Sequence, residues 1–147
     1  MRAAICKAMA DLIKSGVDGS EYSNLFTNVS TKNLHFDEIP DFPYCTVTPG
    51  MSTRKYMPGS FTWVYQDIRI RLYVKDDDAE GKLELLIADI EKIIDSNLSI
   101  EYTITKASGD VETGYTTESR INSVTTDEGI LKPLGFGEIS VNIQYAK

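Results

Sequence analysis

The acidic run from Asp76 to Glu80 is the clearest candidate for chemistry, because closely spaced carboxylates can bind calcium or magnesium. Its alternate carboxylates stand at the first, third and fifth positions of a calcium loop, and Gly81 stands at the sixth. The twelfth position of such a loop needs a glutamate that binds through both oxygens, but Ile87 stands there. The pattern therefore fails at its most demanding ligand.

Helix capping explains the same run. An aspartate ahead of a helix accepts hydrogen bonds from the first backbone amides, and its charge suits the positive helix end. Asp77 followed three residues later by Glu80 is typical of a capping box. We favour the cap, and a small metal-dependent hydrolase using carboxylates near Asp76 to Glu80 is the alternative from a different functional class.

The other candidate catalytic residues are isolated. His35 is the only imidazole, which excludes a histidine-rich metal site and favours a structural or solvated role. Cys6 and Cys45 are too few for a disulfide scaffold and lie in apolar runs typical of buried thiols. Because no Walker motif, zinc spacing or dinucleotide fingerprint occurs either, the sequence predicts a protein that is not an enzyme and needs no cofactor.

The length and the charge of the chain exclude further classes of protein. The 147 residues suit one domain, placed at residues 1–147. A net charge of −7 makes the chain a poor non-specific binder of nucleic acid, because phosphate contacts need a basic face. No apolar run approaches the roughly 18 residues of a membrane span, and Lys7 and Asp11 interrupt the start where a secretory signal would be apolar. We expect no membrane association and synthesis in the cytoplasm.

Two helices are predicted from apolar residues spaced three and four apart. One covers residues 3–14 and ends near Gly16, and the other covers residues 79–96 with Asn97 as its C-cap. The first is too short to be stable alone and needs a sheet to lie on.

Residues 61–75 have the strongest strand pattern, with apolar residues alternating with charged ones up to Val74. Trp63 and its aromatic neighbours fall on the parity that should face water. Since fifteen extended residues reach about 50 Å, we expect a hairpin arm that protrudes from its domain and offers its aromatic face to a partner chain. The alternative is a β-bulge near Gln66 that turns the aromatic side chains into the core.

The segment before this strand is predicted as a short strand over residues 44–48, followed by a loop over residues 51–60. The loop combines basic, aromatic and thioether side chains, which suits a contact surface, and a solvated hairpin tip is the alternative. The residues expected at an interface with other copies or partners are Arg54, Tyr56, Trp63, Arg69 and Arg71.

Residues 17–42 lack a clear period and are expected to form an irregular connection anchored by apolar residues such as Leu25 and Phe26, or to hold a short strand near residues 33–36. Further extended segments are expected at residues 100–105, 115–126 and 139–145.

Together these elements predict an α+β fold, with two helices on an antiparallel or mixed sheet of about five strands and a long protruding β-hairpin arm. The expected core is Ile5, Met9, Leu12, Ile13, Val47, Ile68, Ile70, Leu72, Val74, Leu83, Leu86, Ile87, Ile90, Ile94, Ile104, Ile139, Val141 and Ile143.

Three junctions carry a family resemblance. An apolar–proline pair leads into an alternating strand at residues 42–50, a strand leads through acidic residues into a helix at residues 68–94, and a glycine-containing connection leads into the last strand at residues 126–145. In these places the chain resembles the tail terminator proteins of long-tailed bacteriophages, also called tail completion or tail-to-head joining proteins. Residues 17–42 depart from that pattern.

The resemblance implies a structural virion protein that forms a hexameric ring on the tail tube, stops tube polymerisation and joins the tail to the head or neck. The implied partners are other copies of the chain, the tail tube protein and a head–neck or completion protein, while DNA passes through without specific binding. The implied location is the head-proximal end of the virion tail, after synthesis in the host cytoplasm. A head-completion or neck protein of the same virion and an interaction domain of cellular origin are further alternatives.

Overall fold

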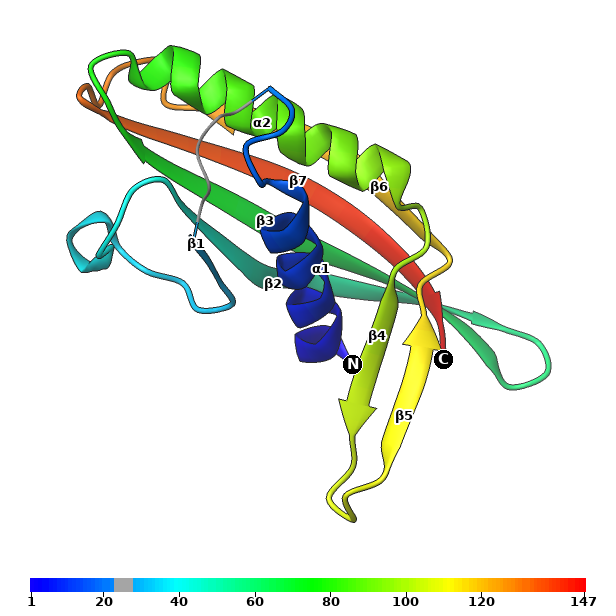
Figure 1. Cartoon of the computed structure of the whole chain (residues 1–147). Helices are drawn as coiled ribbons and strands as arrows, with labels where there is room; N and C mark the ends of the chain where they lie inside the picture. The colour runs from blue at the N-terminus through cyan, green and yellow to red at the C-terminus, as the bar shows by residue number, and fades with distance from the viewer. Residues whose placement is uncertain (23–27) are drawn as a thin grey trace.

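The computed structural model describes residues 1–22 and 28–147 and combines two helices with seven strands (Figure 1). The elements in chain order are α1 (Arg2–Gly16), β1 (Asn28–Ser30), the 3-10 helix η1 (Phe36–Glu38), β2 (Tyr44–Met57), β3 (Phe61–Lys75), α2 (Ala79–Ser96), β4 (Glu101–Thr105), β5 (Val111–Tyr115), β6 (Glu118–Thr126) and β7 (Leu134–Ala146).

The strands form two sheets. Five of them make the main sheet in the order β1-β2-β3-β7-β6, in which β1 is parallel to β2 and every other pair is antiparallel. Strands β4 and β5 form a separate antiparallel hairpin. The predicted α+β fold, with two helices on a mixed sheet of about five strands, is confirmed.

Strand β3 has one buried and one partly exposed face over most of its length. The even-numbered residues from Val64 to Val74 are buried, and β3 pairs with β7 without a register shift from Trp63 opposite Ala146 to Lys75 opposite Leu134. The alternative of a bulge near Gln66 is therefore wrong. The aromatic residues keep the outward parity that the alternation predicts.

The irregularity lies instead on β2, between Pro49 and Ser52. The bulge frees the carbonyl oxygen of Gly50, which accepts hydrogen bonds from Nε2 of Gln66 and from Nη2 of Arg2, each at 3.1 Å. A buried amide and the first turn of α1 thus replace the ladder partner that this carbonyl loses.

The prediction of a loop over residues 51–60 is wrong, because β2 continues past Pro49 as far as Met57. Proline is tolerated there since it lies beside the bulge, where strand pairing is already interrupted. The hairpin turns at residues 58–60, where Gly59 and Ser60 have φ angles of 83° and 63°. The tip projects beyond the neighbouring strand β7, as Figure 1 shows.

Both helices lie on the same side of the main sheet (Figure 1), and the core fills the space between them. Of the predicted core residues, Leu12 and Ile104 are only partly buried and the others are buried. The predicted burial of the Cys6 and Cys45 thiols is confirmed. Further buried residues lie outside the predicted core: Val17, Val64, Ile100, Tyr102 and Tyr145.

The short strand predicted near residues 33–36 lies earlier, at Asn28–Ser30, where it pairs with the first residues of β2. The expected anchors Leu25 and Phe26 lie outside the described residues. Phe36 packs its ring against Tyr73 at 5.0 Å and Phe136 at 6.2 Å between ring centroids. This aromatic cluster fastens η1 to one end of the sheet face that the helices leave open.

Residues 115–126 do not form one extended segment, because the chain changes sheets at Thr116 and Thr117. The amide of Thr117 donates to the carbonyl of Gln144 in the main sheet, whereas the Thr116 amide donates to Ile100 beside the β4–β5 hairpin. The buried Thr116 hydroxyl also accepts from the Ile100 amide at 2.8 Å. These bonds fix the hairpin to the end of the sheet. Within the described residues, no helix is long and apolar enough to cross a membrane.

The two faces of β3 predict opposite responses to truncation. Ile70→Ala should lower the free energy of unfolding by about 2–5 kcal/mol, because it opens a cavity in the core. Arg69→Ala, the matched control on the adjacent residue and opposite face, should change it by less than about 0.5 kcal/mol. Urea denaturation followed by circular dichroism measures both, and equal effects would contradict the assignment of the faces.

Candidate functional site

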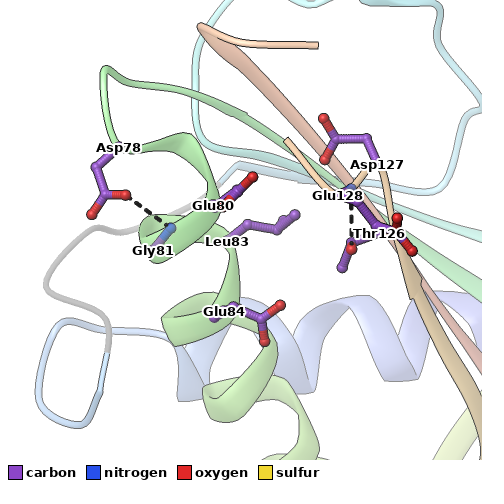
Figure 2. A pocket seen from close by; sticks show the side chains of 8 residues that line it. All are labelled: Asp78, Glu80, Gly81, Leu83, Glu84, Thr126, Asp127 and Glu128. Carbon is purple, nitrogen blue, oxygen red and sulfur yellow. Dashed lines mark hydrogen bonds between the residues drawn. The ribbon is translucent and has the colours of Figure 1, made fainter. Parts of the chain in front are cut away.

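The acidic residues that suggested a metal site line a surface hollow of about 540 Å³ between the start of α2 and the turn that follows β6 (Figure 2). Its carboxylates belong to Asp78, Glu80, Glu84, Asp127 and Glu128. Among the described residues, no group of three or more His, Cys, Asp or Glu side chains is arranged to hold a metal ion.

Two of these carboxylates bind backbone amides. Oδ1 of Asp78 accepts from the Gly81 amide at 3.3 Å and caps α2 (Figure 2), so the cap is Asp78 and not the predicted Asp77. Asp127 accepts from the amides of Leu131 and Phe136, at 3.1 and 3.2 Å, and so holds the turn between β6 and β7. Both groups therefore have a structural role.

The imidazole and the thiols do not assemble into a catalytic group. His35 is exposed at the N-terminus of η1 and takes part in a capping box with Glu38. Burial raises the pKa of Cys6 to about 11, against a smaller opposing effect of Arg2, and burial also raises the pKa of Cys45. Both thiols are thus protonated near neutral pH and are poor nucleophiles.

Three predicted interface residues lie on the open face of the sheet, which the helices do not cover. The Glu138 carboxylate lies between Arg69 and Arg71, with Nε–Oε distances of 3.9 and 3.4 Å. Arg71 also donates to Asn33 and Thr48. Both arginines therefore pair with a carboxylate of their own chain, and the sequence alone did not identify Glu138 as that partner.

The third of these residues, Trp63, belongs to the hairpin arm, which consists of the end of β2 after Ser52, the turn at residues 58–60 and the start of β3. The ring of Trp63 meets that of Phe61 edge to face, with 4.9 Å between the ring centroids. Arg54 and Tyr56 lie on the same arm but on the opposite side, because they pair with Val64 and Thr62 of the other parity. The five predicted residues therefore form no single patch, and they divide between the open face and the arm.

The sequence did not identify other exposed apolar residues as interface candidates. Tyr115 at the end of β5 is 63% exposed, and Ile130 in the turn between β6 and β7 is 81% exposed. An apolar pair, Ile130 and Leu131, inside a segment rich in glycine and acidic residues was a usable signal. Tyr115 had no such signal in the sequence, because the alternating pattern did not distinguish its strand, β5, from β6.

The comparisons with known proteins give the family. A family model described as Bacteriophage Tail Tube Terminator Protein matches residues 1–147. The tail tube terminator protein p142 of Escherichia phage T5 is 39% identical over 149 residues, covering 98% of this chain and 92% of that protein. The chain belongs to the bacteriophage tail tube terminator family. It is a structural component of the virion tail.

A solved structure agrees with the fold of this tail tube terminator. A chain from the virion of a native gene transfer agent particle has a TM-score of 0.54 and 8% sequence identity, and the match covers 100% of the terminator and 95% of that chain. The identity is low, so this likeness concerns the fold alone. The resemblance deduced from the three sequence junctions is confirmed.

The cap can be tested apart from any metal. Asp78→Ala should lower the free energy of unfolding by about 1 kcal/mol, because it removes a hydrogen bond to the first turn of α2. Asp77→Ala, the control, should have an effect below about 0.5 kcal/mol. A stabilisation by Ca²⁺ or Mg²⁺ that Asp78→Ala abolishes would contradict a purely structural cap and support the hydrolase alternative.

The thiols should be nearly inert in the native terminator. With a pKa of about 11, only about 0.1% of Cys6 is thiolate at pH 8, and the side chain is also shielded from reagents. The native protein should react with Ellman's reagent at least about 100-fold more slowly than the protein in denaturant. Rapid release of one equivalent of chromophore from native protein would show that a thiol is accessible.

Proposed function

We propose that the chain acts as a single domain over residues 1–147 and closes with copies of itself into a hexameric ring on the end of the tail tube. The ring stops tube polymerisation and joins the tail to the head or neck. Its role is structural, and no reaction is part of it.

The directions of the strands are the observation that carries the proposal. Along the order β2-β3-β7-β6 each strand runs antiparallel to its neighbour. Strand β6 therefore runs opposite to β2. When a second copy places its β2 beside β6, the antiparallel sheet continues from one copy into the next with no reversal.

Both edges have room for such pairing. In the described part of the chain, β1 covers β2 only at residues 44–46, and β6 is the last strand at the other edge. Exposed strand edges offer unpaired amides and carbonyls to another chain. Since the two edges differ in sequence, their pairing is heterologous, and it closes into a ring when the rotation between copies closes.

Six copies that each contribute four strands form a barrel with a wide central channel. A barrel of about 24 strands is larger than the roughly 16–18-stranded porins, which already enclose an aqueous channel. The helices lie on one side of the sheet (Figure 1). A ring has more circumference outside than inside, so we place the helices outside and the open face on the channel wall.

The middle of the open face is polar and has mixed charges. Arg69 and Arg71 share the carboxylate of Glu138, and Asp67 accepts from the amide of Asn142 at 3.0 Å. Paired charges present no continuous basic surface to phosphates, which fits passage of DNA without specific binding. Of the predicted interface residues, we therefore assign Arg69 and Arg71 to the channel wall and Arg54, Tyr56 and Trp63 to subunit or partner contacts.

The two ends of the sheet differ, as a joining protein needs. One end carries the arm with Arg54 and Tyr56, and the other carries Ile130 beside acidic residues of the hollow. Unlike ends suit unlike partners, the tube on one side and the neck on the other. The alternative of a head-completion or neck protein predicts binding to isolated heads instead of isolated tails.

Assembly can be measured directly. In native mass spectrometry the purified terminator should give a species of six times the 16.4 kDa chain mass, alone or on addition of tail tube protein. In electron microscopy it should cap one end of tube assemblies and halt their growth. A chain that stays monomeric with tube subunits present, or that binds isolated heads and not tails, would overturn the proposal.

A further inference from the structure

Two exposed tyrosines lie at the same end of the molecule, Tyr56 on the β2 edge of the main sheet and Tyr115 just before β6 at the other edge. Tyr56 on the arm is 75% exposed and Tyr115 on β5 is 63% exposed. Exposed aromatic side chains of this size commonly mark protein interfaces. We propose that the arm of one copy docks against the Tyr115 end of β5 in the next copy, an inference that rests on the ring proposed above.

The register of the main sheet relates the arm on β2 to the start of β6. Thr53 of β2 and Gln144 of β7 both pair with Tyr65, and Gln144 also pairs with Glu118 of β6. Thr53 and Glu118 therefore stand in one row across the sheet.

Counting outwards from that row brings the arm of the next copy to the end of the sheet where Tyr115 lies. Strand β6 is antiparallel to the β2 of the next copy, so residues before Glu118 meet residues after Thr53. Tyr115 is three residues before Glu118, and Tyr56 is three residues after Thr53. Tyr115 lies just beyond the change of sheet, so an unstaggered neighbour places its Tyr56 beside the start of β6, next to the end of β5 that carries Tyr115.

The change of sheet at Thr116 and Thr117 leaves β5 accessible at this position. In the part of the chain that the structure describes, β5 pairs with β4 alone, so its other edge has no strand beside it. Gly114 packs closely against the ring of Tyr102, which ties that part of β5 to the buried side of the hairpin. The next residue, Tyr115, is exposed. Figure 1 shows the hairpin and the arm at the same end of the sheet as the C-terminus.

The charges at the two surfaces are complementary. The arm carries Arg54 and Lys55, both exposed. Glu101 is the cross-strand partner of Tyr115, and Glu118, which forms an ion pair with Arg120, follows three residues after it. Opposite charges flanking an aromatic contact favour the pairing of arm with β5 over the pairing of two like edges.

The tilt of strands in a ring shifts the neighbour along the strand direction. For four strands per copy the shift is about four to five residues. Tyr115 then faces the next arm between Met51 and the tip at residues 58–60. That stretch includes Met51, Tyr56 and Met57, and Phe61 of β3 pairs with Met57 across the hairpin. All four side chains are apolar and exposed.

Cysteine cross-linking between two differently labelled chains tests the contact. Protein carrying Tyr115→Cys is mixed with protein carrying Ser52→Cys, Tyr56→Cys or Ser60→Cys, assembled with tail tube protein and oxidised. A disulfide needs Cα atoms about 4.4–6.8 Å apart, so at least one of the three mixtures should give a covalent dimer of the two labelled chains. The native Cys6 and Cys45 are buried and do not interfere.

The matched control pairs Tyr115→Cys with Ile130→Cys, which is equally accessible but lies in the turn at the other end of β6. That mixture should not cross-link. Rings that form without a cross-link in any of the three mixtures, or with an equal yield in the control, overturn the arm contact and leave the ring intact. A complete lack of rings in the unsubstituted protein instead overturns the proposed function.

A double-mutant cycle gives an independent readout. Tyr56→Ala and Tyr115→Ala should each raise the concentration at which rings dissociate by about tenfold, the loss expected for a tyrosine at the centre of an interface. If the residues are in contact, the double variant should be weaker than either single variant by less than about threefold. Fully multiplicative effects would show that the two tyrosines act separately.

Discussion

The alternation of β3 is the constraint on which the rest of the structure depends. Its side chains from Val64 to Val74 are buried at every second residue, and its pairing with β7 has no register shift. A slip of one residue would move all the buried side chains to the other face of the sheet. Because the apolar side chains lie on one face, both helices must pack on that side. A polar face and two unlike edges are left over, and these are the surfaces that the proposed ring uses.

The bulge on β2 separates the part of the hairpin that belongs to the core from the part that forms the arm. Before it, Cys45 and Val47 are buried, and after Ser52 every residue of β2 is exposed. The Gly50 carbonyl connects this point to Gln66 and, through Arg2, to α1. The direction in which the arm leaves the sheet is thus coupled to the packing of the first helix.

Periodic elements could be predicted from the sequence because their signal is local. The two helices, β3 and β7 follow from spacing alone, and most of the predicted core is buried. The predicted strand ended at residue 48, just before Pro49 and Gly50, but a strand beside a bulge accepts both residues. The change of sheet at Thr116 and the capping by Asp78 in place of Asp77 depend on partners distant in sequence or on backbone geometry, which composition does not reveal.

The surroundings of the expected interface residues were harder to predict for the same reason. Arg69 and Arg71 looked available, but Glu138 comes within reach only through the pairing of β3 with β7. Tyr115 looked like part of a longer strand, yet the departure of the chain from the main sheet leaves it exposed. A surface that joins copies of a chain consists of side chains and strand edges that the fold leaves exposed. Its residues become recognisable only after the internal partners of every neighbouring side chain are known.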